Sequence, residues 1–139
     1  MTAFLDTARS VLRDAVGIDA TLGPISPRRS RVEDRIAVVI EVHGDLTGLT
    51  WLFPEAFATH AAHAMAPSLP VAPELLILVV SELANQLTGR GVCALAEHGI
   101  HIELDPPHLT TATASGVTGS LDTELGSIEI VFHGLGRLT

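Results

Sequence analysis

Residues 73–107 read PELLILVVSELANQLTGRGVCALAEHGIHIELDPP, and this stretch decides the fold. Pro73 suits the first turn of a helix, aliphatic side chains dominate the next turns, and Gly89 is a typical stop signal. We therefore predict a helix over about residues 73–88, then a short helical piece over 92–98. The alternating apolar residues of 100–104 predict a strand, which must end at the two prolines that follow.

Upstream of this helix, the spacing of the apolar residues changes from the period of a helix to that of a strand and back. Residues 4–16 repeat apolar side chains at helical spacing between Thr2, a possible cap, and Gly17, a possible stop. Residues 35–43 alternate with the period of a strand, and Gly44-Asp45 offers a two-residue hairpin turn into a second strand over 46–53. A short, alanine-rich helix over 55–65 follows, with Pro54 at its first position.

The C-terminal part is predicted to be sheet. Residues 109–114 and 128–132 read as strands, separated by a Gly- and Ser-containing connection over 115–126 with room for a short strand. This order of elements predicts one domain over residues 1–139 of the α+β class: an antiparallel β-sheet with helices packed on one face. Ala37, Val39 and Val131 fall on the other face, so we expect self-association, most simply as a homodimer.

Composition narrows the classes of function. The chain has 139 residues, of which 47% are hydrophobic and 17% charged, so we expect a folded globule. A net charge of −8 makes nucleic acid an unexpected partner, and the arginines at 28, 29 and 31 read as a solvated loop. The lone Cys93 reads as a small buried residue and excludes an internal disulfide. The longest aliphatic run, 75–80, is too short for a membrane span, so we expect a cytoplasmic protein.

Two polar residues interrupt the apolar helix. Glu82 and Asn85 are three apart and therefore share a helical face, whereas the surrounding leucines and valines would fill the core. Asn85 is the only asparagine in the chain, and asparagine is a poor helix former. Such a pair on the solvent side of a helix is also ordinary, so spacing alone leaves both interpretations open.

The run Glu82-Leu83-Ala84-Asn85-Gln86-Leu87-Thr88-Gly89 resembles the central signature of CheX-type proteins in the CheX/CheC group of chemotaxis phosphatases. The downstream strand that ends in two prolines, and the upstream hairpin that ends in Phe53 and Pro54, also resemble that family. The chain has one such motif, which resembles CheX rather than the two-motif CheC.

This resemblance implies hydrolysis of the aspartyl phosphate on a CheY-like response-regulator receiver domain. It implies that Asn85 orients the attacking water and that Glu82 anchors a lysine of the partner. The receiver would supply its own Mg²⁺, with no cofactor or metal bound by this chain. Ser81 and Arg90 flank the pair and are candidate binding residues. Leu78, Arg90 and Gly91 depart from the usual family pattern.

Other kinds of site were weighed against this one. A non-catalytic CheX-like binding module or a dimeric adaptor in two-component signalling would carry the same motif, so both stay open. The seven histidines lack a closed zinc-ligand spacing, and Ser81 lacks the flanking glycines of a serine-hydrolase elbow. Trp51, the only tryptophan, is expected in the core or at an interface.

Overall fold

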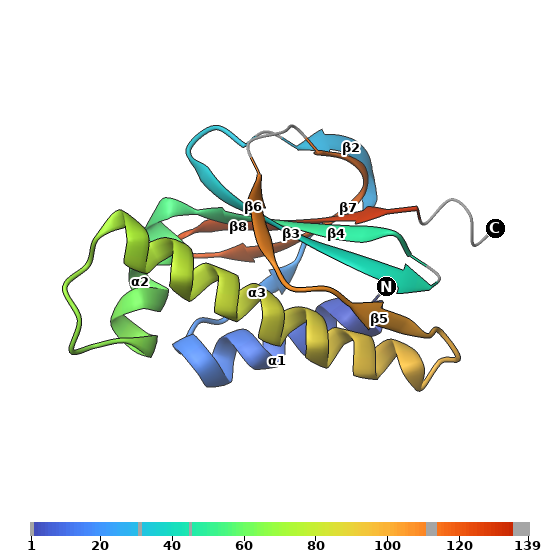
Figure 1. Ribbon diagram of the computed structural model, residues 1–139, viewed down its shortest axis with the longest axis horizontal. Helices are drawn as coiled ribbons and strands as arrows, with labels where there is room; N and C mark the ends of the chain where they lie inside the picture. The colour runs from blue at the N-terminus through green and yellow to red at the C-terminus, as the bar shows by residue number, and fades with distance from the viewer. Residues whose placement is uncertain (1, 31, 45, 111–113, 135–139) are drawn as a thin grey trace.

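The computed structural model describes residues 2–30, 32–44, 46–110 and 114–134. Three helices cover one face of an eight-stranded sheet whose strand pairs are all antiparallel (Figure 1), which confirms the predicted fold class. The helices are α1 (Thr2–Val16), α2 (Glu55–Met65) and α3 (Pro73–Ala96). The strands are β1 (Thr21–Leu22), β2 (Ser26–Ser30), β3 (Arg35–Gly44), β4 (Gly48–Pro54), β5 (Ile102–Leu104), β6 (His108–Thr110), β7 (Ala114–Thr123) and β8 (Gly126–His133).

The predicted hairpin forms the centre of the sheet, whose strand order is β1-β7-β8-β4-β3-β5, with β2 paired to β7 and β6 to β3. Glu41 pairs with Gly48, and the Val42 N–H bonds the Thr47 carbonyl oxygen at 3.2 Å. This is the register that a two-residue turn at positions 44 and 45 produces. Asp45 itself lies outside the described residues, and Pro54 lies one residue before α2 rather than in its first position.

The main core lies between the helices and the sheet. Val38, Ile40 and Val42 point into it from β3, as their alternation predicted, and all are at most 3% exposed. Aromatic rings from α1 and β4 meet at its centre, where the ring centroids of Phe4 and Trp51 are 6.0 Å apart. Burial of this many large apolar side chains is the main source of stability for such a domain.

The helix that carries the Glu-Asn pair is longer than predicted. α3 continues without a break through Gly89 and Gly91 to Ala96, so Gly89 is not a stop, and the separate helical piece predicted over 92–98 is largely part of the same helix. The extension is held by tertiary packing, because α1 and α3 lie side by side and Gly91 is buried against Phe4. Packing of this kind overrides the low helix propensity of glycine.

Two segments predicted as connections are strands. Residues 115–126 were expected to form a connection with at most a short strand, but the ten-residue β7 covers most of them and pairs with β8, β1 and β2. The arginine-containing segment was expected to be a solvated loop, but Arg28 and Arg29 lie in β2. Arg31 and residues 111–113 lie outside the described residues. Of the strand predicted over 109–114, residues 109 and 110 lie in β6 and Ala114 begins β7.

The face of the sheet opposite the helices holds a second, smaller apolar cluster. Ala37, Leu52 and Val131 are at most 2% exposed there, and Val32 packs against them. Figure 1 shows β2 on this side of the sheet, away from the helices. Because the chain itself covers Ala37 and Val131, they no longer argue for self-association, and the homodimer stays a prediction.

Two further sequence expectations concern exposure. Cys93 was expected to be buried, but it lies exposed on α3, because it comes eleven residues, about three helical turns, after Glu82 and so shares the exposed side of the helix. Trp51 is fully buried in the core, as predicted. In the described ranges of the chain, no helix combines the length and the apolar character needed to cross a membrane.

Candidate functional site

The Glu-Asn pair lies on the exposed side of α3. Glu82 and Asn85 are both exposed, whereas Leu83, Ala84 and Leu87 of the same turns are fully buried. One side of the helix is therefore fixed in the core, and the other presents the two polar side chains to solvent on a rigid support. Leu78, one turn before Glu82, continues the exposed side and is 67% exposed.

A buried hydrogen bond fixes how α3 is rotated about its axis. The indole Nε1–H of Trp51 in β4 donates to Thr88 Oγ1 at 2.8 Å, and both residues are fully buried. A tryptophan N–H in a core needs such a partner, so this contact resists any rotation that would turn Asn85 inward. No role was predicted for Thr88 from the sequence. A hydroxyl on the apolar side of the helix, together with a single core tryptophan, was the available signal.

Among the described residues, the Glu82 carboxylate is held only by its own helix. Gln86 Nε2 donates to Glu82 Oε1 at 3.0 Å, a contact between residues one turn apart. Within the described ranges, the Glu82 carboxylate forms no salt bridge. A side chain-side chain contact of this kind is weak and exposed, so the carboxylate can exchange it for a cation on a partner at little cost.

Asn85 keeps its whole amide available. In the part of the chain that the structure describes, its side chain makes no hydrogen bond, and the amide can offer one acceptor oxygen and two donor hydrogens. Ser81 lies one turn before it and is partly exposed. The structure thus places Ser81 on the Asn85 side of the helix, next to the pair, as a binding contact would require.

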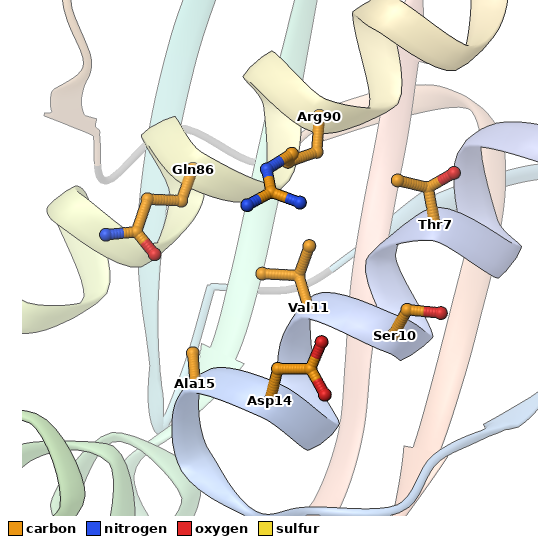
Figure 2. A pocket seen from close by; sticks show the side chains of 7 residues that line it. All are labelled: Thr7, Ser10, Val11, Asp14, Ala15, Gln86 and Arg90. Atoms are coloured by element: carbon orange, nitrogen blue, oxygen red, sulfur yellow. The ribbon is translucent and has the colours of Figure 1, made fainter.

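Arg90 lies apart from Asn85, on the flank of α3 that faces α1. Figure 2 shows its guanidinium extending from α3 over a groove between the two helices. Within the described chain, Arg90 forms no ion pair. The groove is lined by seven side chains from the two helices: Thr7, Ser10, Val11, Asp14, Ala15, Gln86 and Arg90. Gln86 connects this groove to the pair, because it bonds Glu82.

A different polar cluster lies on the opposite face of the sheet. Glu129 of β8 accepts a hydrogen bond from Arg35, lies 3.4 Å from Arg28 Nε, and accepts from Ser30 Oγ at 3.3 Å. Its side chain is only 15% exposed. The Glu129 carboxylate is therefore engaged within the fold, although the buried Arg28 Nε has no hydrogen-bond partner among the described residues. The cluster thus has the character of a structural ion-pair site.

The described histidines do not form a metal centre. No group of three or more His, Cys, Asp or Glu within the described ranges could hold a metal ion. His60 Nε2 lies 2.9 Å from the Val16 carbonyl oxygen, and His43 Nε2 lies 2.9 Å from Asp105 Oδ2. The pKa of His133 is lowered from its ordinary value because the ring is partly buried, and its Nε2 lies 2.8 Å from Thr50 Oγ1.

Taken together, these contacts define an α+β domain that presents the Glu82–Asn85 pair to solvent on its longest helix. No family model matches the chain, and no curated protein matches it in sequence. Solved structures do match its fold. A CheX chemotaxis protein from Desulfovibrio desulfuricans aligns with a TM-score of 0.81 at 19% identity, over 94% of this chain and 95% of its own.

Two further solved structures agree with this match. CheX from Vibrio vulnificus aligns with a TM-score of 0.73 at 22% identity, over 96% of this chain and 98% of its own. CheX from Borrelia burgdorferi, solved in a complex with CheY, BeF3 and Mg²⁺, aligns with a TM-score of 0.71 at 16% identity, over 95% and 96%. The chain therefore has the fold of the CheX and CheC-like chemotaxis proteins, which supports the resemblance of its sequence to that family.

Proposed function

We propose that this protein hydrolyses the aspartyl phosphate of a CheY-like receiver domain. The observation that carries the proposal is the position of Glu82 and Asn85, side by side on the exposed side of α3. Their only described contact is the one between Glu82 and Gln86. The match to a CheX that was solved with CheY supports the choice of partner.

The proposed role of Asn85 is to position the attacking water. Transfer of a phosphoryl group to water requires the water oxygen to lie in line with the bond that breaks, and little covalent help is needed from the catalyst. An amide can accept a hydrogen bond from this water and donate another without adding negative charge beside the phosphate. Mg²⁺ on the receiver would stabilise the charge of the phosphoryl group.

The other site residues would hold the partner. The Glu82 carboxylate would pair with a basic side chain of the receiver, releasing Gln86. Ser81 is small and partly exposed beside Asn85, and Arg90 brings a positive charge to the flank that faces α1. Because this chain has a net charge of −8, local pairs of opposite charge would orient a partner whose own active site is acidic.

A turnover experiment tests the proposal. A panel of purified receiver domains is phosphorylated, and phosphate release is followed with this protein at about one-tenth of the receiver concentration. The proposal predicts faster decay of at least one receiver, with each chain turning over several phosphoryl groups. If no receiver decays faster, the chain is not a phosphatase for the panel.

The same panel identifies the alternative. A non-catalytic binding module or dimeric adaptor would bind a receiver that carries BeF3 and Mg²⁺, yet leave the decay of the phosphorylated form unchanged. The exposed Leu78 and the groove beside Arg90 are compatible with binding alone, so measurements of both affinity and decay are needed.

A further inference from the structure

Two glycines lie inside α3. Packing against other described residues explains why only one of them must be a glycine. Glycine is the least favourable residue inside a helix apart from proline. Gly89 and Gly91 are both followed by further helix, which ends at Ala96, and neither has the positive φ that favours glycine in turns. Each therefore needs a reason other than backbone conformation.

Gly91 is explained by packing. A Cβ atom at this position would lie 2.3 Å from Cδ2 and from Cε2 of the Phe4 ring. Since Phe4 is fully buried between α1 and the core, its ring has no room to move away. Gly91 thus allows α1 to approach α3 closely.

Gly89 has no such explanation. A Cβ atom there would meet nothing within 4 Å, and Gly89 is partly exposed. An alanine would fit without strain and would favour the helix. No packing contact among the described residues requires a glycine here, and the bare position leaves this side of the helix open to a partner.

The position of Gly89 indicates how such a partner would approach. It lies four residues after Asn85, and Ser81 lies four residues before, so both of these neighbours are small, whereas Glu82 flanks Asn85 three residues before it. The Asn85 amide is separated from its Cα by a single methylene group, so it can reach a water on a partner only if the partner comes close to the helix backbone. Larger side chains at 81 or 89 would hold the partner away.

We propose that Gly89 is a contact residue at which the main chain of the phosphorylated receiver packs directly against α3, which brings the phosphoryl group within reach of Asn85. This rests on the proposed function and adds a steric requirement to it. The partner segment that covers Gly89 is a stretch of backbone or small residues, because the bare helix admits a close approach but offers no side chain to pair with.

The test uses Gly89→Ala and Gly89→Gln in the full chain, with a receiver that the wild type dephosphorylates. Both variants should unfold at a higher denaturant concentration than wild type, because both residues are better helix formers than glycine. Affinity for the receiver loaded with BeF3 and Mg²⁺ should fall about tenfold for alanine and about 100-fold for glutamine, as the clash grows. KM should rise by similar factors, and kcat should fall as well, because a displaced partner holds the phosphoryl group beyond the reach of Asn85.

Gly91→Ala is the matched control. It should lower the unfolding midpoint, because its Cβ meets Phe4, yet leave the affinity of the folded fraction for the receiver unchanged. Wild-type affinity in both Gly89 variants would overturn the steric role and leave the phosphatase proposal intact. Loss of stability in Gly89→Ala would also overturn it, since it would reveal an internal role. A wild type that accelerates no receiver would overturn the proposed function itself.

Discussion

The carboxylates of Glu82 and Glu129 lie on opposite sides of the molecule in contrasting surroundings. Glu129 is mostly buried among Arg28, Arg35 and Ser30, and its carboxylate is engaged by these neighbours within the fold. Glu82 is exposed, bonds only the neighbouring Gln86 within the described residues, and lies beside an Asn85 amide that has no described partner. Polar groups that are satisfied within the fold stabilise it, whereas polar groups that a rigid helix presents unpaired are available for a partner.

Among the predicted changes in stability, the largest should come from breaking the polar cluster around Glu129. Glu129→Ala leaves Arg28 and Arg35 without their shared carboxylate in a partly dry environment, so the free energy of unfolding should fall by about 2 kcal/mol. Chemical denaturation measures this, and the phosphatase activity of the folded protein should be unchanged.

The control for this variant is Asp19→Ala. It breaks the Arg13–Asp19 pair, in which both side chains are mostly exposed, so stability should change by less than about 0.5 kcal/mol. Equal losses in the two variants would show that the Glu129 cluster has no special structural role.

Glu82→Ala should have the reverse pattern. Removing the exposed carboxylate should leave stability nearly unchanged, because it loses only the contact with Gln86, but it should weaken binding to the receiver about tenfold. Titration calorimetry with the receiver carrying BeF3 and Mg²⁺ measures the affinity. Gln86→Ala is the control, since it retains the carboxylate and should bind nearly as wild type. An unchanged affinity in Glu82→Ala would refute the anchoring role.

The smallest expected effect comes from His133. Burial lowers the pKa of its ring below the ordinary 6.5, so the unfolded chain takes up a proton more readily than the folded one as the pH falls. Stability should therefore decrease as the pH drops through about 6.5 and level off below the folded pKa. Denaturation of wild type and His133→Gln across this range measures the effect. If the stability of the wild type depends on pH in the same way as that of the variant, the lowered pKa of His133 does not contribute to stability.

The elements that were predicted well are those with strong periodicity. The apolar pattern of residues 4–16 predicted α1, and the alternation of 35–43 predicted the first strand of the hairpin. Both patterns are clear because one face of the helix and one face of the strand are buried in the core. The exposed position of Glu82 and Asn85 followed from the same reasoning, since leucines, valines and alanines of the same turns fill the buried side of the helix. The roles of the pair came from resemblance and stay predictions.

The elements that were missed depend on contacts that a local pattern does not show. β7 is rich in Gly, Ser and Thr. A Cβ on Gly119 would lie 3.0 Å from Leu5, so this strand has a small residue where α1 packs on it. β2 contains Pro27 and two arginines, and it became a strand by pairing with β7. The helix stop predicted at Gly89 failed because packing of Gly91 against Phe4 continues the helix beyond it.

The most direct test of the central claim compares wild type with Asn85→Ala on a phosphorylated receiver at saturating concentrations. Positioning of the water by the amide predicts that the variant loses about 100-fold in the rate of phosphate release. Its stability should be equal to or slightly above that of wild type, because alanine favours the helix. Equal rates of release for the two proteins would contradict the role of Asn85.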